Sequence, residues 1–341
     1  MSYLLITGAT GFIGFKILLG ALKEGYSVRA AVRSPEKGKF LLSHPKILAL
    51  GVVPEKLSLV EVPDIRREGA YDEAIKGVRY VIHSASPLPS PLLDPNTGIY
   101  EPTVKSVWTM LHSALLKAPS LKRLIITSSI VGNTAYPPGS AQGVETTAQS
   151  RVPDTPGPFE SVGPAYGAAK VAALNSIDRF IRNERPPFAV VKLIPGLVLG
   201  RDERALRADD LRAGSNFFLL DLLTGTSAEH PLPSAVADVS DVAKVHLIAL
   251  KEEEVGEGPA IAEDLGVTTS NQFNDAWDLV QKHFPKAVAD GVFRQGDQPT
   301  MPFNWDARPT EVEMGFSFKR YEEMVLDVAG QYLELSGIEK A

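Results

Sequence analysis

Tyr166 and Lys170 are the side chains in this sequence whose types and spacing best suit proton transfer. They stand four residues apart in the stretch YGAAK, and positions i and i+4 lie on the same face of a helix. A free phenol has a pKa of about 10, too high for efficient proton exchange near neutral pH. A fixed ammonium nearby stabilises the phenolate and lowers that pKa. We therefore predict that Tyr166 exchanges a proton with a substrate oxygen, with Lys170 beside it.

Two adjacent serines, Ser128 and Ser129, are the candidate partners of this tyrosine. They follow the apolar run RLIIT at 123–127, so we expect them at the end of a buried strand. A serine hydroxyl there can donate a hydrogen bond to a carbonyl oxygen as negative charge develops on it. Neighbouring side chains of an extended segment point to opposite sides, so only one serine can face Tyr166. Serines that merely bond the local backbone are the structural alternative.

Three glycines, Gly8, Gly11 and Gly14, follow the apolar run at 3–7 in the stretch TGATGFIG. In a strand–turn–helix unit, such residues let the backbone approach a pyrophosphate, which the first N–H groups of the helix then bind. A purely structural turn would use the same residues. The position of the motif, at the start of an alternating strand and helix series, favours phosphate binding.

The elements that must position these groups alternate between short strands and longer helices up to about residue 195. The strand runs are almost entirely apolar, which indicates a parallel sheet covered on both faces. We therefore predict an α/β fold with a Rossmann-type, doubly wound parallel sheet. The expected strands are 3–7, 27–32, 57–62, 80–83, 123–127 and 188–194, and the expected helices are 12–24, 99–117 and 163–183.

The regular alternation stops after Pro195. We expect residues 1–200, with a contribution from about 230–262, to form the first domain. Residues 201–341 are expected to form a smaller, mixed substrate lobe that is interleaved with it.

A Pro- and Gly-rich segment at 131–160 shows no periodicity, and a loop of that length favours a flap over an active site. We expect the substrate pocket to lie between the loop after Ser86, residues 130–136, this flap and the region of Phe217 and Phe218. The two phenylalanines fit either the pocket or the core of the smaller lobe, and we favour the core.

The composition excludes several classes of function. The 341 residues carry a net charge of −6, which argues against a nucleic-acid partner and for a small molecule. The absence of cysteine excludes disulfides and thiolate metal sites, and the six histidines lack metal-ligand spacing, so no metal is expected. No apolar run is long enough to cross a membrane, and a cytoplasmic location is expected.

The motifs TGATGFIG, TSS and YGAAK resemble those of the extended short-chain dehydrogenase/reductase family. The stretches SVRAAVRSPEK, VEVPDI, IHSASP and DVSDVAKVHLIAL resemble one branch of it: plant dihydroflavonol 4-reductases, cinnamoyl-CoA reductases and fungal NADPH-dependent aldehyde, ketone and methylglyoxal reductases. The resemblance implies that hydride passes from NADPH to a small aldehyde or ketone. It also implies that Tyr166 is the general acid and that Lys170 is the cation that binds the ribose. The serine that bonds the carbonyl is expected to be Ser129, and Ser128 is the alternative.

The second strand identifies the form of the cofactor. It ends in Arg33 without an acidic residue, and Lys37 follows. Two cations there suit the 2′-phosphate of NADP, whereas an acid would bond the ribose hydroxyls of NAD. Alternatively, both cations are ordinary solvated surface charges. The resemblance adds positions near the adenine, ribose and nicotinamide. The complete set of expected cofactor-binding residues is Gly8, Thr10, Gly11, Phe12, Ile13, Gly14, Arg33, Lys37, Asp64, Ile65, Ala85, Ser86, Thr127, Tyr166, Lys170, Pro195, Val198 and Ser215.

Two other functions share these features. Nucleotide-sugar epimerases and dehydratases of the extended family have the same glycines, serine, tyrosine and lysine, but they usually favour NAD. A non-catalytic NADP-binding regulator is the second alternative, and the intact Ser–Tyr–Lys set counts against it. The segment at 131–160 and the sequence IPG at 194–196 depart from the family pattern, so the substrate stays open. Relatives resembling this chain are monomers or homodimers, and we expect one of these states.

Overall fold

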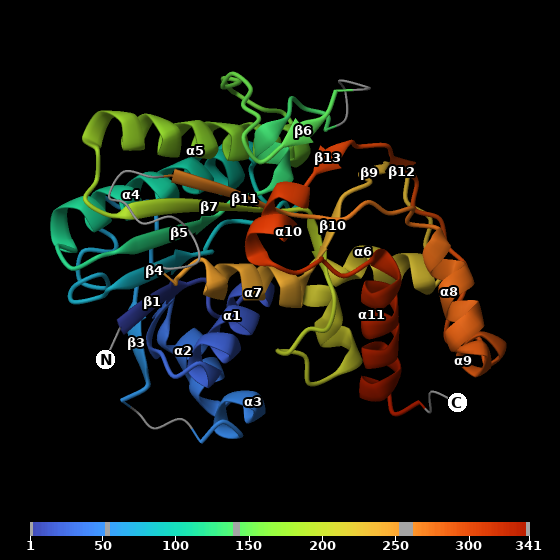
Figure 1. The fold of residues 1–341 in the computed structure, drawn as a ribbon. Coiled ribbons are helices and arrows are strands. Elements are labelled where there is room, and N and C mark those ends of the chain that lie inside the picture. Colours follow the sequence, from blue (N-terminus) through green and yellow to red (C-terminus); the bar gives the residue numbers. More distant parts are fainter. Residues whose placement is uncertain (1–2, 52–54, 139–143, 252–261, 339–341) are drawn as a thin grey trace.

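A seven-stranded parallel sheet forms the centre of the computed structural model, which describes residues 3–51, 55–138, 144–251 and 262–338 (Figure 1). Every pair of neighbouring strands is parallel. The strands, in spatial order, are β11 (Ala262–Val267), β7 (Ala189–Pro195), β5 (Arg123–Thr127), β4 (Tyr80–His83), β1 (Tyr3–Thr7), β2 (Ser27–Val32) and β3 (Leu57–Glu61).

This order confirms the predicted doubly wound fold. The chain builds outward from β1 to β3 and then returns to place β4 on the other side of β1, so the direction of winding reverses there. Ligands of such sheets bind at this reversal, beyond the carboxyl ends of the strands. The six expected strands are present within one residue of their predicted bounds, whereas β11 was not expected as a strand. Its sequence, AEDLGV, has two charged residues directly after the first alanine, and they hide the apolar character of a buried strand.

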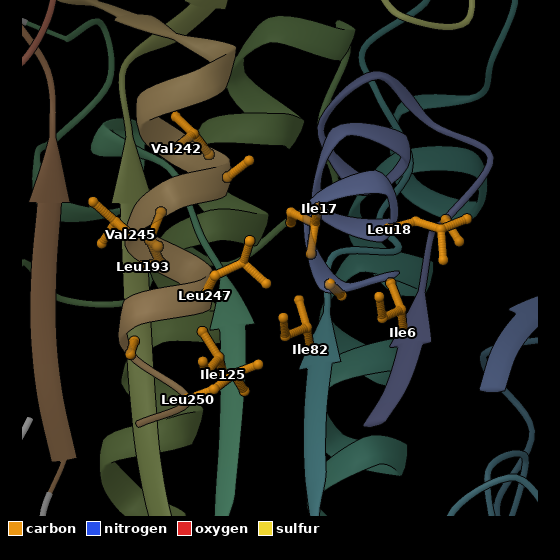
Figure 2. Packing of buried hydrophobic residues seen from close by; sticks show 14 of the residues in the cluster. Ile6, Ile17, Leu18, Ile82, Ile125, Leu193, Val242, Val245, Leu247 and Leu250 are labelled. Carbon is orange, nitrogen blue, oxygen red and sulfur yellow. The ribbon is translucent and has the colours of Figure 1, made fainter. Parts of the chain in front are cut away.

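Helices cover both faces of the sheet (Figure 1). On one face lie α1 (Phe12–Lys23) and α7 (Val239–Ile248), and on the other lie α4 (Glu101–Lys117) and α5 (Val162–Glu184). Alternate strand residues serve the two faces, so Ile6 packs under α1 and α7 while Leu5 faces α4 and α5. Figure 2 shows the first of these cores, where Ile17 and Leu247 meet over the strands. The remaining helices beside the sheet are α2 (Pro35–Ser43), α3 (Pro45–Leu48) and the π-helical turn η1 (Pro95–Tyr100) that leads into α4.

A separate hydrophobic core, away from the two faces of the sheet, joins a smaller group of elements beyond the carboxyl end of β7. Leu219 and Leu223 of one helix pack there with Val280 and Val328 of two others. The helical elements of this group are η3 (Ala208–Ala213), α6 (Asn216–Leu223), α8 (Asp275–His283), α9 (Pro285–Ala289) and α11 (Tyr321–Leu335). The helix α10 (Arg308–Met314) packs beside β11 instead, and its Met314 joins the core under α1 and α7. Its strand pairs are β8 (Leu197–Leu199) with β10 (Val236–Asp238), and β9 (Leu232–Pro233) with β12 (Thr300–Met301). The exact domain boundary at residue 200 stays a prediction.

Ion pairs tie the stretch after β8 to the first helices of the sheet domain. Glu203 accepts from Lys16 of α1 at 2.8 Å and from Lys46 of α3 at 2.5 Å. The next residue, Arg204, lies 5.7 Å from the ring centre of Phe12, at the start of α1. The smaller group of elements is therefore held directly against the glycine-rich turn.

The segment at 131–160 has more structure than its sequence indicates. It starts in the 3-10 turn η2 (Ile130–Asn133), and its strand β6 (Thr146–Thr147) pairs with β13 (Trp305–Asp306). The Trp305 ring lies against Gly266 of β11, where an added Cβ would come within 2.0 Å of it. The bonds that fix the segment therefore come from distant parts of the chain, and local periodicity cannot reveal them.

An ion cluster anchors the same segment to the edge of the sheet. Arg151 bonds Asp178 of α5 at 2.6 Å and Asp264 of β11 at 2.9 Å. Lys192 of β7, buried in the sheet, bonds the same two carboxylates at 2.5 and 2.9 Å. Within the described ranges, no helix combines the length and hydropathy that crossing a bilayer would require.

Candidate active site

The glycine-rich turn between β1 and α1 is packed too closely for any side chain. Gly8 has a φ of +74°, and a Cβ on it would lie 2.9 Å from the backbone nitrogen of Ala85. A Cβ on Gly14 would come within 2.1 Å of the Gly8 carbonyl oxygen. The helix begins at Phe12, and the residue before it, Gly11, provides no side-chain cap. The first N–H groups of α1 are therefore left for a ligand, as a phosphate site requires.

The segment after β4 is fixed beside this turn. The Ser84 hydroxyl donates to the carbonyl oxygen of Thr7 at 2.8 Å, and the Ala85 N–H donates to the Thr7 hydroxyl at 3.2 Å. Ser86, one residue further, accepts a hydrogen bond from the ammonium of Lys170 at 3.2 Å. These contacts link the phosphate end of the site to its catalytic end.

The predicted adenosine end is exposed. Arg33 directly follows β2, and Lys37 lies in the first turn of α2. Both cations are exposed, so they can reach a bound anion without displacing packed side chains. Asp64 accepts from the Arg66 guanidinium at 2.9 Å on each carboxylate oxygen, and these hydrogen bonds lower the pKa of Asp64 to about 2. The carbonyl of Ile65 accepts from Thr109 of α4, which fixes the backbone there.

Tyr166 and Lys170 share one face of α5, as their spacing predicts. The Lys170 nitrogen lies 5.5 Å from the centre of the Tyr166 ring, and the lysine is 5% exposed. Burial lowers the pKa of Lys170 to about 8. Burial also raises the pKa of Tyr166 to about 12, and a hydrogen bond with Ser129 partly offsets this rise. The phenol pKa is therefore higher, not lower, than the ordinary value, because desolvation of the phenolate dominates in this structure.

The two serines occupy different environments. Ser129 is partly exposed and bonds Tyr166. Ser128 is 9% exposed and lies with Lys170 along the wall of a small cavity. The structure thus brings Ser129, Tyr166 and Lys170 together, with Ser128 turned away from the phenol.

The cavity beside Lys170 is lined by both polar and apolar residues and has room for about one water molecule. His83 and Thr103 line it, and each has a buried side-chain atom without a hydrogen-bond partner among the described residues: the imidazole Nε2 and the hydroxyl oxygen. The other imidazole nitrogen of His83 bonds the Thr7 hydroxyl at 2.8 Å, and burial lowers the pKa of His83 to about 3. His83 is thus a packed residue of its strand.

The residues predicted to bind the nicotinamide end lie near the glycine-rich turn. Pro195 ends β7, and Val198 follows on β8. The Ser215 hydroxyl donates to the carbonyl of Val198, and a Cβ on the adjacent Gly214 would lie 3.5 Å from the Phe12 side chain. Ser215 therefore lies near the glycine-rich turn, although more than 200 residues separate the two in the sequence.

Aromatic side chains border the site. Tyr136 lies across the first turns of α5, with its hydroxyl 2.7 Å from a Cβ placed on Gly163, and is half exposed. Phe217 stacks on Phe218 with 3.9 Å between ring centres, and Phe217 is 37% exposed. The preference for Phe217 and Phe218 in the lobe core is therefore wrong. Leucines fill the buried face of α6 instead, and the two rings lie on its other side.

The sequence analysis did not identify His246 of α7. Its Nε2 atom lies 2.8 Å from the hydroxyl oxygen of Thr127, the last residue of β5. Local sequence offers no signal for this contact, because 119 residues separate the pair.

Comparisons with known proteins agree with this arrangement. Residues 4–213 match the NAD dependent epimerase/dehydratase family. Ketoreductase CTB6 of Cercospora beticola is 36% identical over 98% of this chain and 96% of its own length. NAD-dependent epimerase/dehydratase ALT6 of Alternaria alternata is 32% identical over 97% of this chain and 98% of its own. The structure of the yeast methylglyoxal/isovaleraldehyde reductase Gre2 complexed with NADPH is 27% identical, with a TM-score of 0.78, over 98% of this chain and 99% of that chain. The resemblance inferred from the motifs is confirmed.

Proposed function

Because this chain belongs to the NAD dependent epimerase/dehydratase family, we propose that it is an NADPH-dependent reductase that converts the carbonyl group of a small aldehyde or ketone into an alcohol. The observation that carries the proposal is the meeting of Ser129, Tyr166 and Lys170 at the carboxyl edge of the sheet, beside the glycine-rich turn. A ketoreductase that is 36% identical over nearly the whole chain supports the same reaction class.

The residues at this edge fit NADP(H). Side chains at Gly8 or Gly14 would collide with neighbouring atoms of the chain, so this tight turn requires glycine at both positions, and no side chain caps the first N–H groups of α1. Exposed cations follow β2, where a 2′-phosphate needs them. We propose that the cofactor is held by Gly8, Thr10, Gly11, Phe12, Ile13, Gly14, Arg33, Lys37, Asp64, Ile65, Ala85, Ser86, Thr127, Tyr166, Lys170, Pro195, Val198 and Ser215.

In this mechanism Tyr166 supplies the proton. Ser129 and Tyr166 bond each other through their hydroxyls, and we propose that a substrate carbonyl oxygen replaces this bond and accepts from both, which stabilises the negative charge that develops there. Bound NADPH supplies the hydride for the carbonyl carbon. A Tyr166 pKa of about 12 keeps the phenol protonated at neutral pH, as carbonyl reduction requires, whereas alcohol oxidation needs the phenolate. Lys170 would donate to the ribose hydroxyls of the bound cofactor and, as a cation, would ease loss of the Tyr166 proton.

A panel of activated aldehydes, α-dicarbonyls and aryl ketones tests the proposal through NADPH absorbance. At least one carbonyl should consume NADPH, and Tyr166→Phe should lose nearly all of that turnover while it still binds NADPH. Tyr332→Phe is the matched control, because it removes a phenol hydroxyl from α11, in the core of the smaller group of elements and away from Ser129 and Lys170. Turnover that survives in Tyr166→Phe would contradict the assignment.

The alternative reaction is epimerisation or dehydration of a nucleotide sugar, which the name of the Alternaria relative suggests. It predicts tightly retained NAD and conversion of a nucleotide sugar without net cofactor oxidation. If no carbonyl in the panel consumes NADPH while a nucleotide sugar is converted, this alternative is correct. NADPH binding without any conversion would point to a non-catalytic regulator.

We further propose a cytoplasmic location, a monomeric or homodimeric state, and a division at about residue 200 into an NADP-binding domain and a substrate lobe. Cell fractionation and light scattering test the first two. Limited proteolysis with and without NADPH tests the division.

A further inference from the structure

His246 is a buried histidine whose two ring nitrogens are both bonded. It has no exposed surface. Its Nδ1 atom lies 2.8 Å from the carbonyl oxygen of Val242, one turn earlier in α7. Its Nε2 atom lies 2.8 Å from the Thr127 hydroxyl oxygen, at the carboxyl end of β5. The histidine therefore bridges a helix on one face of the sheet and β5, the strand that precedes the two serines.

The two contacts fix the position of the ring proton. A carbonyl oxygen only accepts hydrogen bonds, so Nδ1 carries the proton. Burial lowers the pKa of His246 to about 4, so the ring is neutral at physiological pH. Nε2 is consequently an acceptor, and the Thr127 hydroxyl must donate its hydrogen to it.

Thr127 is left with only lone pairs to offer a ligand. Thr127 is partly exposed, and it is one of the residues around the small cavity that Ser86 and Lys170 also line. We propose that His246 is a positioning residue: it holds the Thr127 hydroxyl so that this oxygen accepts a hydrogen bond from an O–H or N–H donor on the nicotinamide half of the cofactor. This inference rests on the proposed function, because that function places the cofactor at the end of β5.

Nitrogen-15 NMR of the cofactor-free protein tests the proton assignment directly. The His246 signals should show a protonated Nδ1 and an unprotonated Nε2, with no change between pH 6 and 8. A protonated Nε2 would overturn the proposal, since the ring would then donate to Thr127 and free its hydrogen.

NADPH titration followed by fluorescence tests the role in binding. Thr127→Val removes the acceptor, and the Kd for NADPH should rise by about threefold to tenfold, the usual range for one hydrogen bond. His246→Leu should raise it by a similar factor, because the unanchored hydroxyl no longer presents its lone pairs. His246→Gln retains a donor for Val242 and an acceptor for Thr127, so it should recover most of the affinity that His246→Leu loses.

The double variant Thr127→Val/His246→Leu should bind no more weakly than Thr127→Val alone, because both changes remove the same interaction. Val245→Ala is the packing control: it deletes buried methyl groups from α7, and it should lower the Tm of the cofactor-free protein without changing the Kd. If His246→Leu behaves like this control, or if the two effects on Kd add, His246 is only a core residue. If the wild-type protein does not bind NADPH, the proposed function itself fails.

Discussion

Two buried lysines, Lys170 in the candidate active site and Lys192 on β7 beside the edge strand β11, have opposite surroundings. Lys192 bonds the carboxylates of Asp178 and Asp264. Lys170 bonds only the Ser86 hydroxyl, and among the described residues it forms no ion pair. Burial of a charge costs free energy unless a counter-charge offsets it. The difference indicates that Lys192 supports the fold, whereas burial of Lys170 costs stability, as the role proposed for it toward a ligand would require.

Lys170→Met gives the largest expected effect. Turnover should fall by about 10³-fold, within the usual range for loss of assisted proton transfer. The Tm of the cofactor-free protein should rise, because methionine fills the same space without an uncompensated charge. Kinetics and calorimetry on the same sample check both outcomes. A lower Tm would mean that Lys170 has a stabilising partner and that the contrast with Lys192 is wrong.

The pH dependence of the free energy of unfolding should also show the cost of burying the charge of Lys170. The pKa of Lys170 in the folded chain is about 8, against an ordinary value of 10.5, so as pH falls the unfolded chain takes up the proton first. Stability should therefore decrease as pH falls from about 10.5 to about 8, by up to about 3 kcal/mol, and should recover as pH rises. Denaturant unfolding of the wild-type protein and Lys170→Met at several pH values isolates this contribution. Curves that stay parallel from pH 8 to 10.5 would refute it.

Lys192→Met should do the reverse of Lys170→Met. It leaves Asp178 and Asp264 with Arg151 as their remaining cation, so the free energy of unfolding should drop by about 2 kcal/mol, less than for an isolated buried pair that loses one partner. The Kd for NADPH should stay unchanged, because the cluster lies away from the proposed cofactor residues. Denaturant unfolding and NADPH titration measure the two quantities. Weaker NADPH binding would show that the cluster shapes the site.

Arg33→Asp extends the comparison to an exposed cation, whose charge stays in water and therefore carries no burial cost. The preference for NADPH over NADH should fall by about tenfold or more, since a carboxylate repels the 2′-phosphate and accepts from ribose hydroxyls. Stability should change by less than about 0.5 kcal/mol, as for most surface substitutions. Arg294→Asp makes the same charge change at an exposed position of the smaller lobe, and it should leave the preference intact. An unaltered preference in Arg33→Asp would mean that the 2′-phosphate lies elsewhere.

Sequence patterns predicted those parts of the molecule that depend on neighbours in the chain. The apolar runs located six strands, and the spacings around Gly8 and Tyr166 located a turn and a helix face. The raised pKa of Tyr166 was not predictable, because it depends on how completely the folded chain removes water from the phenol.

Contacts between distant residues were also out of reach. Thr127 and His246 are 119 residues apart, and Arg151 and Asp264 are 113 apart. Charged residues near the start of β11 concealed this strand in the sequence. Among them, Asp264 is neutralised in the folded chain by Arg151 and Lys192, which are distant in the sequence. The apolar appearance of Phe217 favoured the core, although leucines of the same helix already fill it.

The anchoring of the 131–160 segment has a consequence for attempts to change substrate choice. Its backbone pairs with Trp305, the Trp305 ring rests on Gly266, and its Arg151 reaches Asp264. A graft of this segment alone from another reductase would lose Arg151 as a partner of Asp264 and would have to rebuild the pairing with Trp305, whose ring stays on Gly266. A functional chimera would have to exchange the edge strand and residues 305–306 together with it, so three stretches of the chain behave as one inherited module.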